Sequence, residues 1–260
     1  MNDSLKFYSK LSLFSIREEQ SSLSGTLGRL LLYPCFIWIF SKLWLGLNYN
    51  FTTLGIEALF AYIGLTEILF MTTLREPLID RASSDFSLSF VRPRFWPIYT
   101  ITSIYSRTLS RRLFYLLFYI IIMPFFISDF ILLSISALRF LFFLPVLTIF
   151  DTLYSFLLTS LQIRFHSIKN FRMLFGKLFL IFGGVLAPLS DIHEPWNEIF
   201  LNTPFSDLIF QPCYFSIKAE FYQISFLNWS ARIIIQLICL LVLSVWIYCG
   251  SRKYYHNFGG

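Results

Sequence analysis

Long apolar runs separated by short charged segments are the dominant feature of this chain. A helix needs roughly 20 apolar residues to cross the hydrocarbon core of a bilayer, which is about 30 Å thick. Only 14% of the 260 residues are charged, whereas soluble domains carry about 25%, so the polar side chains are too few to cover a water-soluble surface. The sequence therefore predicts an all-α membrane protein, with apolar runs at residues 30–47, 51–74, 113–163, 171–189 and 231–249.

The run at residues 113–163 is too long for a single crossing and must contain a turn. A turn at 128–130 would leave the first of its two helices short, whereas a turn at 134–137 gives two helices of ordinary spanning length. We favour the second turn. Residues 30–260 are then predicted to form six transmembrane helices.

The basic residues predict the orientation, because Lys and Arg are enriched in cytoplasmic segments. They cluster before the first span, in the loop 75–112, after the fourth span and in the C-terminal tail, whereas the loop 190–226 is mainly acidic. Both termini are therefore predicted to be cytoplasmic, and topology explains the net charge of +6 without a nucleic-acid partner. The basic residues in question are Lys6, Lys10, Arg17, Arg29, Arg75, Arg81, Arg92, Arg94, Arg107, Arg111, Arg112, Arg164, Lys169, Arg172, Arg252 and Lys253.

Residues 1–29 mix apolar side chains, among them Leu11 and Phe14, with Lys and Ser at irregular helical spacing. This composition predicts an interfacial helix that lies on the inner membrane surface. The alternative is a disordered N-terminal tail.

No residue pattern in the chain indicates catalysis. The phosphate-binding loop GxxxxGK[ST] is absent, the four cysteines form no CxxC pair, and the three histidines lie in three different predicted loops. A metal site needs converging ligands with a supporting shell, which these spacings do not provide. The sequence predicts that the chain is not an enzyme and holds no metal or cofactor of its own.

Two acidic residues within the predicted spans are candidates for a substrate pathway. An ionisable group in the bilayer costs on the order of 3 kcal/mol, so it usually faces the protein interior or water. Asp151 falls in the middle of the fourth span, and Glu67 lies one or two turns from the inner end of the second. In the alternative interpretation, Asp151 only neutralises Lys42 or Arg139 near the outer rim.

The segment 175–215 predicts an apolar helix that ends at Gly183-Gly184 and Pro188, followed by short pieces punctuated by proline. Proline disfavours helix at the residue before it. Non-helical backbone is tolerated at membrane depth only where protein or water surrounds it. We therefore expect re-entrant pieces that fold back into the bundle on the outer side, with a plain extracellular loop as the alternative.

This segment resembles the ABC-2 family of exporter permeases. In that family the fifth helix ends in a small-residue turn of the form Gly-x-x-x-Pro, followed by a Pro-Trp pair and a Pro-Phe pair. Residues 184–188 (GVLAP), then Pro195-Trp196, then Pro204-Phe205 follow the same order.

A second segment, SDFSLSFVRP at residues 84–93, is similar to the sequence Gly-Glu-Leu-Asp-x-Tyr-Leu-Leu-Arg-Pro of one bacterial branch of the family. Ser84, Ser87 and Ser89 stand where Gly, Asp and Tyr are usual in that branch. The C-terminal residues 252–254 (RKY) resemble its basic-aromatic tail.

The resemblance implies a permease subunit in a bacterial cytoplasmic (inner) membrane that exports an amphipathic, lipid-linked or drug-like substrate. Its partners would be a second permease, identical or related, and a pair of ABC ATPase subunits that bind ATP and Mg. Residues 1–29 would be the connecting helix, and the loop 75–112 would hold the coupling helix. The family's roles would fall on Ser84, Asp85, Phe86, Ser87 and Leu88 for coupling, and on Gly183, Gly184, Pro188, Pro195, Trp196, Pro204 and Phe205 for an outer gate.

Three other functions stay open at this stage. An ATP-independent ion- or proton-coupled carrier would show flux without an ATPase. A membrane enzyme acting on lipids would need a further set of polar groups at the depth of Asp151. A non-transporting assembly or regulatory subunit would copurify with a complex but move nothing.

Overall fold

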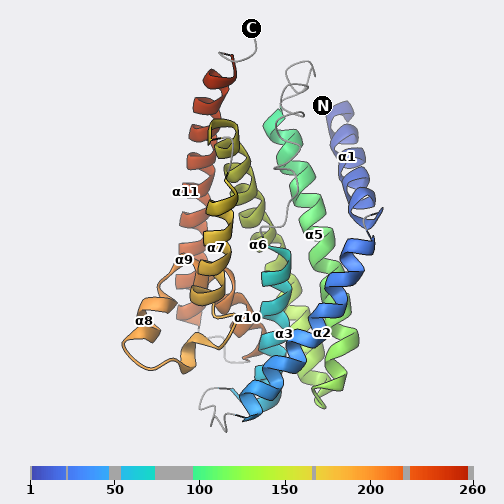
Figure 1. Ribbon diagram of the computed structural model, residues 1–260, viewed down its shortest axis with the longest axis vertical. Coiled ribbons are helices and arrows are strands. Elements are labelled where there is room, and N and C mark those ends of the chain that lie inside the picture. Colours follow the sequence, from blue (N-terminus) through green and yellow to red (C-terminus); the bar gives the residue numbers. More distant parts are fainter. Residues whose placement is uncertain are drawn as a thin grey trace.

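The computed structural model describes residues 2–21, 23–46, 54–73, 96–165, 168–218 and 223–256, and every regular element within these ranges is helical. The long helices run along the long axis of the molecule, and α1 begins at the same end at which α11 finishes (Figure 1). In chain order the elements are α1 (Asn2–Ser21), α2 (Leu23–Gly46), α3 (Ile56–Thr72), α5 (Trp96–Ile122), η1 (Met123–Phe125), α6 (Phe130–Phe165), α7 (Lys169–Phe182), η2 (Leu189–Asp191), α8 (Trp196–Leu201), α9 (Pro204–Leu208), α10 (Phe210–Ile217) and α11 (Gln223–His256).

Three of the described helices are long and apolar enough to cross a membrane, judged by length and composition: Pro97–Phe125, Phe130–Gln162 and Phe226–Gly250. Helix α2 contains a shorter apolar stretch, Leu31–Leu43. The chain is therefore an all-α, multi-pass membrane protein. Helices α3 and α7, with 17 and 14 residues, are about 25 and 21 Å long at 1.5 Å per residue.

Helix α3 forms the centre of the bundle. Its residues from Leu59 to Leu69 are all buried, because α2, α5, α6 and α10 pack around it. Helix α11 lies instead on the outside of α6, and apolar side chains such as Ile235 and Val242 are about three-fifths exposed. Exposed aliphatic side chains on a spanning helix are suited to contact with lipid.

The turn between α5 and α6 differs from the one favoured above. Helix α6 runs unbroken from Phe130, so a turn at 134–137 is wrong and the alternative at 128–130 is confirmed. Asp129 explains the position, because its Oδ1 accepts hydrogen bonds from the backbone N–H groups of Ile131 (2.9 Å) and Leu132 (3.1 Å). A carboxylate in this role is a strong helix N-cap.

Helix α5 also corrects the expected loop 75–112. Residues 96–112 are helical, so Arg107, Arg111 and Arg112 belong to a spanning helix and not to the connection before it. This early start gives α5 its 27 residues and removes the objection that a turn at 128–130 would leave it short. Residues 75–95 lie outside the described part of the chain.

Helix α1 confirms a helical N-terminus over residues 2–21, against the alternative of a disordered tail. Residues 23–29, expected to belong to the same helix, instead form the start of α2. It runs alongside the upper part of α5 (Figure 1). Leu11 and Ser15 form its buried side, and Ser15 Oγ shares a 3.0 Å hydrogen bond with Ser103 Oγ of α5. Its placement on a membrane surface stays a prediction.

Candidate functional site

Arg112 is the largest fully buried side chain in the described part of the bundle, with 2% of it exposed. It lies on the face of α5 that turns toward α3 and α6. Its Nε donates to Thr72 Oγ1 (3.3 Å), and its Nη1 donates to Thr148 Oγ1 (3.1 Å). Its Nη2 donates to Thr73 Oγ1 (3.2 Å) and Asp151 Oδ2 (3.3 Å). One guanidinium therefore joins three helices, with α3 and α6 both bound to α5.

Asp151 supplies the opposite charge in this cluster. Its side chain is 5% exposed and forms an ion pair with Arg112. The interpretation that it neutralises Lys42 or Arg139 is therefore wrong; Arg139 instead lies close enough to donate to the carbonyl oxygen of Lys218, at 3.4 Å. The sequence does not reveal this partner, because Arg112 precedes the apolar run and is therefore predicted to lie in a cytoplasmic loop. A role for Asp151 in a substrate pathway stays a prediction.

Glu67, the second pathway candidate, is buried in α3 and 2% exposed. It lies five residues before Thr72, which places its Cα about 7 Å away from Thr72 along the helix axis. Glu67 and the Arg112–Asp151 pair are therefore both inside the bundle, but they lie at different heights along the axis of α3.

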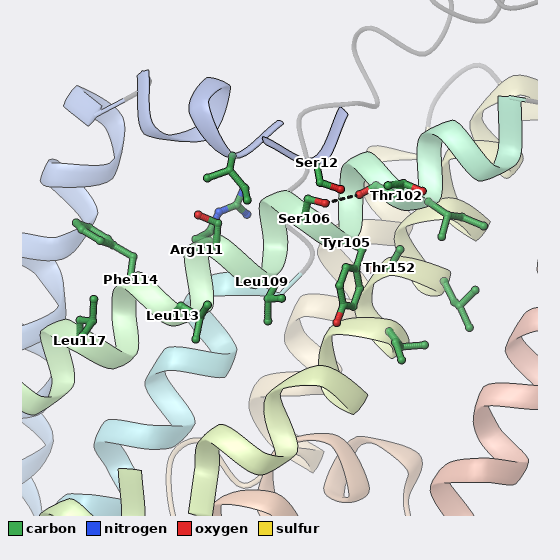
Figure 2. Close-up of a pocket in the computed structure, with 15 residues that line it drawn as sticks. Ser12, Thr102, Tyr105, Ser106, Leu109, Arg111, Leu113, Phe114, Leu117 and Thr152 are labelled. Atoms are coloured by element: carbon green, nitrogen blue, oxygen red, sulfur yellow. Dashed lines mark hydrogen bonds between the residues drawn. The ribbon is translucent and has the colours of Figure 1, made fainter. Parts of the chain in front are cut away.

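A cavity of about 950 Å³ lies between α1, α5 and α6. Arg111, Tyr105 and Thr152 line one part of it, and Leu113 and Leu117 line another. Figure 2 shows the Arg111 side chain extending toward α1. Arg111 and Arg112 face different neighbours because adjacent residues on a helix point about 100° apart. Two consecutive arginines followed by an apolar run are the only sequence signal of this arrangement.

Gly184 anchors the start of the outer region to the centre of the bundle. Its backbone carbonyl accepts a 2.6 Å hydrogen bond from the Tyr62 hydroxyl of α3. Its φ of +70° favours glycine, and a Cβ at this position would lie 2.9 Å from both Leu189 Cγ and Tyr62 Oη. Gly183 ends α7, as the sequence predicts.

The proline-punctuated pieces after Gly184 form η2, α8, α9 and α10, which lie toward the end of the molecule opposite the termini (Figure 1). Pro188 precedes η2, Pro195 precedes α8, and Pro204 is the first residue of α9, whose N-cap Thr203 accepts from the Ser206 N–H. Pro212 instead lies inside α10. The predicted breaks at Pro195 and Pro204 are therefore confirmed.

The two aromatic residues of this region have different surroundings. Phe205 packs against α7, with its ring centroid 5.1 Å from that of Phe179. Trp196 begins α8 and is 58% exposed. The structure thus brings Phe205 and the glycine turn close to the bundle and leaves Trp196 at its surface.

Asp207 holds this outer region against α11, which the sequence did not indicate. Its Oδ1 is 2.9 Å from Arg232 Nη2, its Oδ2 accepts from Gln236 Nε2 (2.7 Å), and its backbone carbonyl accepts from Trp229 Nε1 (2.9 Å). Burial raises the pKa of the Asp207 carboxyl above its usual range, while Arg232 and then Gln236 lower it. The carboxyl therefore carries an unfavourable desolvation cost that its partners offset only in part.

The five residues expected to form the tip of the coupling helix are not placed by the structure. Ser84, Asp85, Phe86, Ser87 and Leu88 all lie outside the described residues. Of the connection 74–95, the structure therefore shows only the two flanks, Thr73 and α5.

Compared with models of known protein families, the chain matches none, and no curated protein matches its sequence. The family resemblance therefore stands on the motifs quoted above.

Proposed function

We propose that this chain is the permease subunit of an ATP-driven, ABC-2-type exporter. The observation that carries the proposal is the return of the short outer helices into the bundle. Helix α10 packs on α3 and α6, and Phe210, Cys213 and Phe215 on it are buried. A plain extracellular loop would not be packed in this way. This arrangement supports the re-entrant region that the resemblance implies.

The six spans of such a permease would be α2, α3, α5, α6, α7 and α11, with α1 as the connecting helix. Helix α1 begins at the same end of the molecule at which α11 finishes (Figure 1). This arrangement supports an even number of membrane crossings. The lengths of α3 and α7 fall below a full crossing. In the proposal, the outer pieces after α7 and the residues Leu54 and Gly55 before α3 extend these two spans at the outer side.

The Arg112 cluster provides a physical route for coupling. Thr72 and Thr73 are the last described residues before the connection 74–95, and Arg112 holds both. The same side chain holds Thr148 and Asp151 of α6. A force applied to the connection by an ATPase would therefore act on α3, α5 and α6 together. In the proposal Asp85 to Leu88 dock on that ATPase, which binds ATP and Mg.

The cycle would require two permeases, identical or related, and an ATPase pair in a bacterial inner membrane. Closure of the ATPases would move the coupling helices and open an outer gate built from the turn at Gly184, Pro188 and the Pro204-Phe205 pair. The apolar helix surfaces support an amphipathic or lipid-linked cargo. Transport of this kind needs different cargo affinities in the two states, not a nucleophile.

A second candidate is an ATP-independent, proton-coupled carrier, which the burial of Glu67 in α3 favours. Such carriers use ionisable groups that change charge during the cycle. The pairing of Asp151 with Arg112 counts against it, because this carboxylate is already engaged by a guanidinium that also binds three threonine hydroxyls. We therefore rank this function second.

Site-specific photocrosslinking tests the proposed docking. A photoreactive amino acid at Leu88 is expected to crosslink to a soluble ATPase when the chain is expressed in its native cell. The same amino acid at Trp196, the exposed first residue of α8 on the proposed outer side, is the matched control and is expected to give no such product. ATPase adducts at both positions, or at Trp196 alone, would contradict the proposed sidedness and the docking site.

A further inference from the structure

The cavity between α1, α5 and α6 lies at membrane depth. Its lining residues on α5, between 101 and 117, and on α6, between 149 and 153, all fall within the candidate spans of these two helices. Helix α1 contributes Ser12 and Ile16 to the lining. The volume of about 950 Å³ is in the range of small-molecule sites, roughly 300–1,000 Å³. Atoms that line an empty space lose dispersion contacts on one side, so an occupant would stabilise this part of the bundle.

The wall of the cavity makes little demand for polar contacts. Ser12, Ser106 and Thr152 each donate a hydrogen bond to the backbone carbonyl four residues earlier in the same helix, at 3.0, 2.8 and 2.7 Å. Most of the other lining side chains are aliphatic or aromatic. Water in a cavity needs several polar partners, whereas apolar cavities stay dry and bind hydrocarbon. The lining therefore favours a hydrocarbon occupant.

The cavity also reaches the lipid-facing surface of the bundle. Leu117 of α5 is 60% exposed and Ile149 of α6 is 42% exposed, and both line the cavity. Figure 2 shows Leu113, Phe114 and Leu117 in succession along α5. From Leu109 to Leu117 this helix advances about 12 Å, close to the roughly 15 Å of hydrocarbon in one leaflet of a bilayer about 30 Å thick. The apolar path thus has the depth that an acyl chain occupies in its own leaflet.

We propose that this cavity binds one acyl chain of a bilayer phospholipid, which enters from the lipid-facing surface between Leu117 and Ile149. The head group stays outside the cavity. Arg111 has an interaction within the protein, and the proposed ligand does not use its charge. The chain fills the space between α1 and the α5–α6 pair, where it supports the hydrogen bond between Ser15 and Ser103 in holding α1 in place. This site does not depend on an ATPase partner.

Native mass spectrometry of the purified full-length chain in mild detergent tests the site. The wild type is expected to retain one tightly held dioleoyl phosphatidylcholine. Leu113→Trp narrows the cavity and should lower this retention at least about fivefold, because the larger side chain displaces the contacts of the acyl chain. Leu241→Trp makes the same change at an exposed residue of α11 outside the cavity. It is the matched control and should retain the lipid as the wild type does.

Two further measurements use the wild type alone, so they stay decisive if Leu113→Trp folds poorly. Dioleoyl phosphatidylglycerol should be retained as well as the phosphatidylcholine, because the chain and not the head group is bound. Addition of dioleoyl phosphatidylcholine to the delipidated protein should slow hydrogen exchange in residues 10–16 of α1. Dioctanoyl phosphatidylcholine, whose chains are too short to follow the path along α5, should have little effect.

The other occupant that could cover this apolar surface is a second copy of the chain. Oxidation of Leu117→Cys in the native membrane should give no more disulfide-linked dimer than the wild type, whose four cysteines provide the background. An additional dimer would show that a second copy covers the cavity, and it would overturn the proposal. Equal lipid retention by Leu113→Trp and the wild type, a strong preference for one head group, or unchanged exchange of α1 would also overturn it.

Discussion

Arg112 on α5 and Asp151 on α6 form an ion pair that is almost wholly buried, with 3.3 Å between Nη2 and Oδ2. Three threonine hydroxyls from α3 and α6 complete the contacts of the guanidinium. Burial of two charges is costly, and such pairs persist where further hydrogen bonds satisfy the remaining donors. This cluster therefore fixes how the three central helices pack.

Asp151→Asn should strongly destabilise the protein, because it leaves the Arg112 charge buried without a counter-charge. Removal of one partner of a buried pair costs about 3–5 kcal/mol. The free energy of unfolding in mild detergent measures the effect. The double variant Arg112→Met, Asp151→Leu should recover most of the loss, and Arg139→Gln should change little. A mild effect of Asp151→Asn would mean that the pair does not hold the bundle together.

Tyr62→Phe should loosen the outer region by removing the hydrogen bond to the Gly184 carbonyl. The expected loss is about 1 kcal/mol. Gly184→Ala should cost more, because a φ of +70° disfavours alanine and its Cβ would meet Leu189 and Tyr62. Hydrogen exchange of residues 185–218 reports both changes. Protection unaltered by either variant would show that Gly184 does not anchor this region to α3.

Asp207 should make stability depend on pH in a defined direction. Burial raises its pKa above the ordinary value of 3.8, so between these two values the folded protein binds more protons than the unfolded chain. The contribution of Asp207 to stability is then largest below pH 3.8 and falls as the pH rises through the raised pKa.

Asp207→Asn cannot titrate and isolates this effect. The melting temperature of the wild type minus that of the variant should decrease as the pH rises from below 3.8 toward neutrality. A difference that instead increases with pH would show that the ion pair with Arg232 outweighs the cost of burial.

Asp129→Ala should shift or fray the start of α6, because the side chain caps the Ile131 and Leu132 N–H groups. Loss of an N-cap of this kind costs about 1 kcal/mol. Asp129→Ser, which retains a capping oxygen, is the matched control and should cost only a fraction of that. Thermal unfolding of the two variants compares them. Equal losses would show that the cap does not set the turn at this position.

Local signals in the sequence predict some features well and others poorly. The all-helical membrane class follows from apolar runs, and the end of α7 at Gly183 follows from the weak helix preference of glycine. The turn before Phe130 is not apparent from the sequence, because Arg111 and Arg112 resemble the end of a charged loop and make the preceding helix look too short. A charged residue does not by itself mark the end of a helix, because an opposite charge or a hydrogen-bond acceptor elsewhere in the chain can pair with it inside the bundle.

The contacts that define the candidate site join residues distant in the sequence. Arg112 meets Asp151 across 39 positions, and Tyr62 meets Gly184 across 122. In the sequence, Tyr62 and Asp151 are single polar side chains within apolar runs, Arg112 directly precedes such a run, and Gly184 is a glycine near the end of another. The pairing becomes apparent only when the packing of α3, α5 and α6 is known, so sequence reasoning located Asp151 and Gly184 but not what they bind.

The proposed function depends most directly on whether an ATPase partner exists. The measurement is affinity purification of the tagged chain from its native membrane in mild detergent, followed by mass spectrometry. The proposal predicts a stoichiometric ATPase with a GxxxxGK[ST] loop, lost when Phe86 and Leu88 are both changed to Glu. A folded, monodisperse chain that copurifies with no ATPase would contradict it and direct attention to ATP-independent flux through Glu67.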